Sequence, residues 1–393
     1  MDGKQNRRLN ADRSALPPGS VYYERLANVY HIAKYAVVVL LVIFVLITAI
    51  AGRGELKSEN FKYFFKYFQM NPFSRSSYEG IRYIGNADMK FSMYKGDLFV
   101  LCDGNATLYN MAGRAILADH TDGADSFDSS GKYLAVYRRG AMTAKLYNSF
   151  SDVYTVNTEY PITCVCTDGD GGFAVVSSEK GVRTSITVYN QAFAPVYIWR
   201  STDKYAVCCA LSDDGSRLGV LAVGTSGGVQ YSQLTVKNVL NGETVCEQTY
   251  SGEQPLGLCF MKNGDVVSVT EKAMRAYSSK GTEKFEAPFS GELECIEAGE
   301  LGLTVCTASG NGSLISVYDK DMKKTAEFTV GTKVIKAITT EKATYALAYD
   351  KFFEYKGELS ATDIDGGAVN MFSLSDGDVL ICYPSGTELK ETD

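Results

Sequence analysis

Four strand-like runs follow one another between residues 257 and 286: Gly257-Leu-Cys-Phe-Met, Asp265-Val-Val-Ser-Val-Thr, Ala273-Met-Arg-Ala-Tyr and Thr282-Glu-Lys-Phe-Glu. The runs are short and rich in β-branched and aromatic residues, which favour strands. Gly, Asn and Asp interrupt them, and these residues favour tight turns because they tolerate positive φ. The stretch therefore predicts one structural unit of four strands.

Two markers of this unit recur from residue 78 to the end of the chain. The first is a Tyr and a small polar residue at the end of an alternating run, with some variation, and successive copies lie 37 to 48 residues apart. Its first residue is Tyr109, Tyr147, Tyr189, Lys237, Tyr277, Tyr318 or Tyr355, so Lys takes the place of Tyr in the fourth copy. The second is a turn before a strongly apolar run, and it begins at Lys95, Ser130, Asp170, Asp214, Asn263, Glu300, Lys342 and Asp376. Together the markers define eight repeated units.

Units of four strands and roughly 40 residues, with no convincing helix between them, are typical of a β-propeller in which each unit forms one blade. We predict an all-β propeller of eight four-stranded blades over residues 78–393, with seven blades as the alternative. The eighth unit lacks its outer strand, since only Thr387-Glu-Leu-Lys-Glu follows its apolar run. The run Ser77–Gly85 belongs to no unit and could supply that strand, because closing the ring removes an exposed sheet edge.

These repeats resemble those of the WD40-like and quinoprotein-like β-propeller superfamily over residues 78–393. The Tyr-Asn and Tyr-Asp endings resemble a degenerate form of the Trp-Asp ending of WD repeats, and Val236-Lys-Asn-Val-Leu-Asn-Gly-Glu243 resembles the strand-turn-strand of quinoprotein repeats. Quinoproteins dock their blades with a repeated Trp, whereas this chain has the single Trp199. The resemblance therefore implies the fold without a pyrroloquinoline cofactor or dehydrogenase activity, and we expect no cofactor.

The most apolar stretch of the chain precedes the repeats. Tyr35–Gly52 contains no charged residue and is flanked by Lys34 and Arg53. As a helix it would extend roughly 27 Å, close to the hydrocarbon thickness of a bilayer. We therefore predict one transmembrane helix. A buried soluble helix is one alternative, and a signal peptide is the other, because Ala49-Ile-Ala51 is an A-x-A cleavage pattern.

Charge predicts the orientation of the chain in the membrane. Residues 1–34 carry six Lys and Arg against three Asp and Glu, which favours a cytoplasmic N-terminus and an extracytoplasmic propeller. The formal net charge of the chain is -7. Residues 1–34 and 53–68 are net positive, so the rest of the chain carries about -12. Because phosphate binding needs a clustered basic surface, this acidic domain argues against a nucleic-acid partner.

The predicted layout has four parts. A disordered cytoplasmic tail at residues 1–20 precedes a juxtamembrane and transmembrane helix at 21–52. An aromatic amphipathic segment follows at 53–77, with Phe61, Phe64, Phe65 and Phe68 at helical spacing; it would lie against lipid or pack on the domain that follows. The propeller occupies 78–393. This layout resembles an uncharacterised family of single-pass membrane proteins from clostridia and related Gram-positive bacteria.

The usual metal ligands are scarce. The ten cysteines include no C-x-x-C pair, and several lie among Val, Leu and Ile, where Cys behaves as a small buried hydrophobic residue. His31 and His120 are the two histidines of the chain. We therefore expect no zinc site and no other bound metal.

Two motifs have both a chemical and a structural interpretation. His120 with Asp119 or Asp122 could belong to a Ser-His-Asp triad, or it could be a solvated loop residue. Asp168–Gly172 and Asp363–Gly366 resemble pieces of calcium loops, but they fall where the repeat requires hairpins. We assign no catalytic residue and no metal ligand to either motif.

Loops on one face of the propeller provide the predicted partner-binding site. In propellers of this type, the loops from strand four to the next blade share a face with the loops between strands two and three, and that face commonly binds the partner. The candidates in these loops are His120, Arg138, Arg139, Arg183, Trp199 and Arg200, with Lys180 nearby. Trp and Arg are enriched in binding hot spots. The alternative is that Trp199 covers a blade edge and the arginines are solvated.

The sequence thus favours a membrane-anchored protein that binds or scaffolds a protein or cell-wall partner at the cell envelope. An envelope enzyme acting on glycan or peptide is the alternative, and a deep central pocket with converging carboxylates or His120 would distinguish it. Signalling across the membrane is a third hypothesis. It would require a recruited partner, because a tail of 34 residues is too short for a catalytic domain.

Overall fold

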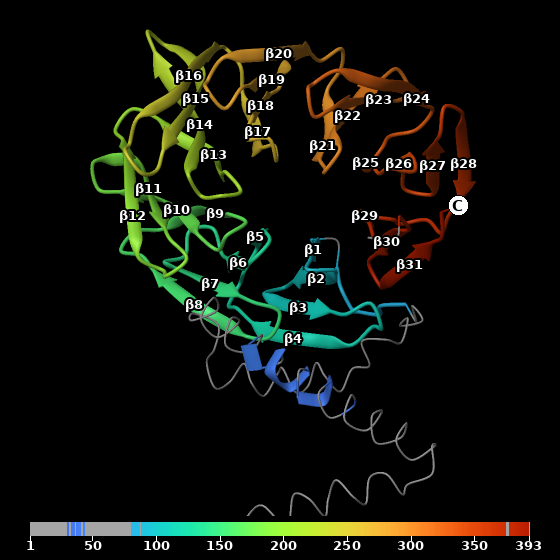
Figure 1. Cartoon of the computed structure of the whole chain (residues 1–393). Helices are drawn as coiled ribbons and strands as arrows, with labels where there is room; N and C mark the ends of the chain where they lie inside the picture. Colours follow the sequence, from blue (N-terminus) through green and yellow to red (C-terminus); the bar gives the residue numbers. More distant parts are fainter. Residues whose placement is uncertain are drawn as a thin grey trace, which may run out of the picture. The chain divides into compact units, whose positions relative to one another are not determined.

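Eight small antiparallel sheets arranged in a ring make up the described chain from residue 80 onward (Figure 1). The structure is a computed structural model that describes residues 30, 33–35, 37–40, 42–43, 80–86, 88–374 and 377–392. The chain divides into two units, Met1–Met70 and Asn71–Asp393, and the ring belongs to the second. The described residues of the first unit are helical.

Each sheet is one blade, and its strands follow chain order from the centre of the ring outward (Figure 1). Blade 1 contains β1 (Lys90–Tyr94), β2 (Asp97–Cys102), β3 (Asn105–Tyr109) and β4 (Ala115–His120). Blade 2 contains β5 (Ser126–Ser129), β6 (Leu134–Tyr137), β7 (Thr143–Tyr147) and β8 (Asp152–Asn157). Blade 3 contains β9 (Ile162–Thr167), β10 (Phe173–Glu179), β11 (Val182–Tyr189) and β12 (Pro195–Ser201). Blade 4 contains β13 (Tyr205–Leu211), β14 (Arg217–Ser226), β15 (Val229–Asn238) and β16 (Thr244–Ser251).

The second half of the ring repeats this order. Blade 5 contains β17 (Pro255–Phe260), β18 (Val266–Thr270), β19 (Ala273–Tyr277) and β20 (Glu283–Pro288). Blade 6 contains β21 (Leu293–Ala298), β22 (Gly302–Ser309), β23 (Gly312–Asp319) and β24 (Lys324–Val330). Blade 7 contains β25 (Lys336–Thr339), β26 (Thr344–Leu347), β27 (Lys351–Tyr355) and β28 (Leu359–Asp363). Blade 8 contains β29 (Asn370–Ser373), β30 (Val379–Tyr383) and β31 (Gly386–Lys390). The prediction of eight blades is confirmed.

The outer strand of blade 8 comes from the segment before blade 1, as the sequence predicts. Arg82 forms an antiparallel bridge with Gly386, the first residue of β31. The backbone N–H of Thr387 donates to the Ile81 oxygen at 2.9 Å, and the Ile81 N–H donates to the Thr387 hydroxyl at 3.1 Å. Residues 80–83 therefore close the ring and cover the edge of β31.

The tyrosine marker lies at the end of the third strand of a blade, and the residue after it explains the repeat. In blade 3, Tyr189 ends β11 and Asn190 follows. The Asn190 Oδ1 atom accepts the backbone N–H groups of Ala192 at 3.0 Å and Ala194 at 3.1 Å, so the side chain closes the turn to β12. Equivalent turns are closed by Asn110, Asn148, Asn238, Ser278 and Asp319.

Hydrophobic side chains fill the spaces between neighbouring blades. The second strand of a blade is covered on both faces, and in β18 every residue is buried. Between blades 8 and 1, Ile81, Tyr83, Leu98 and Leu380 pack into one cluster. The Tyr83 hydroxyl also lies 2.9 Å from the backbone oxygen of Tyr383. Ring closure therefore buries apolar surface in addition to pairing the backbone.

Within the described residues, no helix has the length and apolar character needed to cross a membrane. Of the predicted anchor at 35–52, residues 35, 37–40 and 42–43 are described, and they are helical. The rest of that segment lies outside the described residues. So do the predicted tail at 1–20, the A-x-A pattern at 49–51 and the aromatic segment with its four phenylalanines.

Candidate binding face

The loops of the ring fall into two sets, one on each face. Loops between strands two and three and loops from strand four to the next blade share one face, which we call the upper face. In blade 1 these two sets touch, since the Thr121 N–H donates to the Gly104 oxygen at 2.8 Å. Each of the six predicted site residues lies in an upper loop or on a strand near its upper end.

Three of the six candidates meet where blade 1 adjoins blade 2. His120 ends β4, and the Arg138 side chain lies next to Gly123 in the following loop. Arg139 is held by its Nε–H, which donates to the Ser126 hydroxyl at 3.2 Å. The structure therefore places His120, Arg138 and Arg139 at the same blade junction on the upper face.

The other three candidates lie in blade 3 and point in different directions. Trp199 and Arg200 are consecutive on β12, so their side chains lie on opposite faces of the sheet. Trp199 packs partly buried against the core between blades 3 and 4, whereas Arg200 pairs with Glu179 at 2.9 Å. The Arg183 guanidinium lies over the Tyr205 ring, 5.1 Å from its centroid. Their role in partner binding stays a prediction, and Trp199 also contributes to packing.

A hollow of about 330 Å³ lies at the upper ends of three inner strands, and we call it the cationic hollow. Lys90, Ser126 and Asn370 are the first residues of β1, β5 and β29, and they line it together with Arg139. The Lys90 ammonium donates to the backbone oxygen of Asp125 at 2.6 Å. In the described part of the chain, neither Lys90 nor Arg139 forms an ion pair with a carboxylate. The hollow therefore carries two positive charges.

A second hollow of about 620 Å³ adjoins the first and shares Met89 and Lys90 with it. We call it the acidic hollow, because its lining includes the exposed carboxylates of Asp88, Asp103 and Asp125. The Asp125 carboxylate is bound to a residue of the cationic hollow, since the Arg139 backbone N–H donates to Asp125 Oδ1 at 3.1 Å. Three carboxylates face one ammonium here, so the two hollows have opposite net charge.

The sequence reasoning missed the inner-strand residues of these hollows. Lys90 and Asn370 are 280 residues apart and meet only because the ring closes. The upper-loop rule points to Arg139, and it could also have pointed to Asp103 and Asp125, which lie in the same kind of loop. The rule considers loops alone, so it cannot identify Lys90 and Asn370, which lie at the ends of inner strands.

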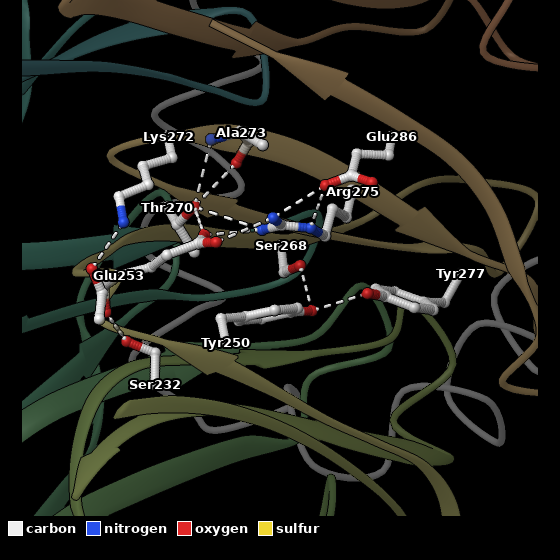
Figure 2. Close-up of polar contacts among 11 residues, drawn as sticks. Ser232, Tyr250, Glu253, Ser268, Thr270, Lys272, Ala273, Arg275, Tyr277 and Glu286 are labelled. Carbon is white, nitrogen blue, oxygen red and sulfur yellow. Dashed lines mark hydrogen bonds and ion pairs between the residues drawn. The ribbon is translucent and has the colours of Figure 1, made fainter. Parts of the chain in front are cut away.

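A buried polar network links blades 4 and 5 (Figure 2). Two guanidinium nitrogens of Arg275 on β19 donate to Glu253 at 2.9 and 3.0 Å, and Arg275 lies over the Tyr250 ring. The Thr270 hydroxyl donates to Glu253 at 2.6 Å. Burial alone would raise the pKa of the Glu253 carboxyl, but the bonds from Arg275 and Thr270 outweigh it and lower that pKa. Because these groups satisfy one another, the network is a structural link.

The surroundings of His120 do not form a catalytic triad. Its Nδ1 lies 3.0 Å from Asn105 Oδ1, and its Nε2 lies 3.5 Å from an Asp122 oxygen. Asp119 is engaged elsewhere, because its Oδ2 pairs with the Lys145 ammonium at 2.8 Å. Over the residues described, no hydrogen bond joins the imidazole to a Ser or Cys side chain.

The first Asp-rich motif is a backbone turn. Asp168 Oδ1 accepts the N–H groups of Asp170 at 3.0 Å and of Gly171 and Gly172 at 2.7 Å. Gly171 has a φ of 99°, a conformation that glycine adopts without strain. Across the part of the chain that the structure describes, no group of three or more His, Cys, Asp or Glu side chains is placed to hold a metal ion.

The ring of blades is an eight-bladed β-propeller, and the two hollows make part of its upper face concave and charged. Solved structures share the fold at low sequence identity. BamB from Moraxella catarrhalis matches with a TM-score of 0.53 and 12% identity, over 80% of this chain and 97% of BamB. The computationally designed Ika8 protein gives 0.55 and 11% identity, over 80% and 98%. Dihydro-heme d1 dehydrogenase NirN in complex with DHE gives 0.53 and 12%, over 77% and 69%.

The chain belongs to a family of unknown function, DUF5711, whose signature matches residues 74–386. This range starts just before the closing strand at 80–83 and ends where β31 begins. No curated protein matches the chain. The solved structures therefore agree with the propeller fold.

Proposed function

We propose that the protein is a membrane-anchored binding or scaffolding protein of the cell envelope, which presents the upper face of its propeller outside the membrane. The observation that supports binding most is the pair of adjoining hollows. Concave sites with a few convergent polar groups are the usual location of ligand binding. The expected partner is a protein or a cell-wall component.

The membrane part of the proposal rests on the sequence of Tyr35–Gly52 and on the charge before it. The overall layout, which resembles that of the clostridial single-pass proteins, is a further argument for it. Protease added to intact cells should digest the propeller and leave the N-terminal tail protected. Protection of the propeller would reverse the orientation, and a mature N-terminus at Gly52 would replace the anchor with a signal peptide.

Partner capture tests the binding role. We expect a chemical cross-linker applied to intact cells to yield an adduct with the wild-type protein, and expect the double variant R138E/R139E to lose it. Both side chains are exposed, so the variant should keep its melting temperature. The control is K262E, because exposed Lys262 lies in a loop between the first and second strands, on the opposite face. Equal capture by wild type and R138E/R139E would reject the binding face.

An envelope enzyme acting on glycan or peptide is the second candidate, and the carboxylates of the acidic hollow are the observation in its favour. Paired carboxylates can serve as acid and base in such reactions. Hydrolysis of envelope glycan or peptide by the purified protein, abolished in D103N, would establish this candidate. Absence of turnover would leave binding as the function of the face.

A further inference from the structure

We propose that the cationic and acidic hollows together bind the free C-terminal end of a peptide that carries an ammonium group close to its terminal carboxylate. This inference rests on the proposed function, because it names the chemistry of the partner at the same face. Its carboxylate would lie in the cationic hollow and its ammonium group in the acidic hollow.

The donors of the cationic hollow suit a carboxylate. Arg139 uses Nε–H to reach Ser126 at 3.2 Å, and across the described ranges its two Nη groups have no hydrogen-bond partner. A guanidinium binds a carboxylate through two parallel bonds. Asn370 Oδ1 accepts the Met371 N–H at 2.8 Å, which leaves the amide NH₂ to donate. Lys90 adds an ammonium at the boundary with the acidic hollow.

The walls of the cationic hollow suit the rest of a terminal residue. Met89, Phe91 and Phe127 line it beside the polar groups. Phe91 and Phe127 belong to the inner strands β1 and β5, so the wall is part of the folded ring. Apolar side chains next to a carboxylate-binding group favour a residue with an uncharged side chain at the peptide end.

The acidic hollow suits an ammonium group. Asp88 has no side-chain hydrogen bond in the described residues. The Asp103 carboxylate accepts two, from Asn86 Nδ2 at 2.8 Å and from the Cys102 thiol at 3.7 Å. Both carboxylates are exposed, so they can exchange water for a cation without breaking a buried network. Because this hollow shares Met89 with the cationic one, a single short ligand can reach both.

Opposite charges in adjoining hollows argue for a peptide end. A phosphate or a uronic acid would be attracted by Lys90 and Arg139 but repelled by the neighbouring carboxylates. A peptide with a lysine-like residue near its C-terminus carries both charges within one short segment. Charge complementarity of this kind discriminates against ligands with one charge.

Fluorescence polarisation with the full-length protein in detergent tests the proposal. The probe is fluorescein-Ala-Lys-Ala with a free carboxylate, and we expect saturable binding. Two matched probes replace the carboxylate with an amide or Lys with norleucine. Each should bind at least roughly tenfold more weakly, because each removes one charge-assisted contact. Inorganic phosphate should not compete.

Variants assign each charge to its hollow. R139Q should remove the preference for carboxylate over amide while keeping the preference for Lys over norleucine. D88N/D103N should do the reverse. Asn tolerates the positive φ of 48° at residue 103, so the fold should be preserved. K262Q, at exposed Lys262 on the opposite face of the ring, is the control and should bind every probe like wild type.

Two results would overturn the inference. One is the absence of saturable binding of the free-carboxylate probe at millimolar concentration. The other is an equal loss for all probes in R139Q, which would mean that the hollow does not recognise the carboxylate. If either occurs while R138E/R139E still loses its cellular partner, the proposed function stands and only the ligand class is wrong.

Discussion

Asp97 is a buried carboxylate whose ionisation opposes folding. It is the first residue of β2, and its side chain has no hydrogen-bond partner in the part of the chain that the structure describes. Burial raises the pKa of Asp97 from 3.8 to about 6. Between these two values the folded state binds the proton more tightly than the unfolded state does. The protonated Asp97 side chain therefore contributes fully to stability below pH 4, and this contribution decreases as the pH rises to about 6.

We predict that D97N raises the free energy of unfolding at pH 7.5 by about 2 kcal/mol, because a pKa difference is worth about 1.4 kcal/mol per unit and partial solvation reduces it. The gain should shrink toward pH 4. Urea unfolding at pH 4.5 and pH 7.5 measures the gain in the free energy of unfolding and its decrease at the lower pH. The exposed Asp350 provides the control D350N, which should not show this pH-dependent gain. If the free energy of unfolding of D97N changed with pH in the same way as that of wild type does, Asp97 would not be the source of this pH dependence.

Asn190 represents the small polar residue that follows the marker tyrosine. We predict that N190A lowers the free energy of unfolding by about 1 kcal/mol, because two backbone N–H groups lose their acceptor. N190D keeps that oxygen and should lose less. Thermal unfolding of the three proteins provides the comparison, and equal melting temperatures for N190A and wild type would argue against this role.

At the level of elements, the Arg275–Glu253 pair joins β19 to the loop between β16 and β17. Both side chains are mostly buried, with exposed fractions of 11% and 13%. We predict that R275M destabilises the protein by about 3 kcal/mol, since it leaves a buried carboxylate unpaired. The double variant R275M/E253Q should recover most of this loss. Chemical denaturation of the double-mutant cycle measures it, and additive losses would show that the two residues act independently.

The closing strand at 80–83 offers a matched pair of substitutions. Ile81 is fully buried between blades 8 and 1, and Ile84 is fully exposed three residues later. We predict that I81D lowers the free energy of unfolding by about 3 kcal/mol because it buries a charge, and that it exposes the edge of β31. I84D should behave like wild type. Melting temperature and size-exclusion profile measure the two effects, and equal behaviour of the two variants would mean that the strand does not hold the ring closed.

How far sequence predicts structure differs between these elements. The marker tyrosines and the turns before the second strands depend on local conformation, so their strands could be predicted from residue type and spacing. The closing strand could be predicted because the eighth unit visibly lacked one. The hollows could not, since Lys90 and Asn370 meet through ring closure and strand register, which no local pattern encodes. The side-chain direction of Trp199 depends on register in the same way.

At the scale of the whole molecule, the ring provides a rigid frame and the upper face provides the chemistry. Inner strands from blades 8, 1 and 2 bring residues from both ends of the propeller to one place. Such a site depends on a closed ring, so I81D should also weaken peptide binding even though Ile81 lines neither hollow. Trp199 and Arg200 of blade 3 form a separate part of the face.

Site-specific photo-cross-linking in intact cells tests the central claim most directly. A photoreactive amino acid can replace Ile84 on the upper face and Leu240 in a loop between the third and fourth strands on the opposite face, where exposure is 100% and 90% respectively. Because both positions are almost fully exposed, the comparison tests the effect of the face alone. Partner adducts from position 84 and none from position 240 are the predicted result. Adducts from position 240 alone, or from neither, would contradict binding through the upper face.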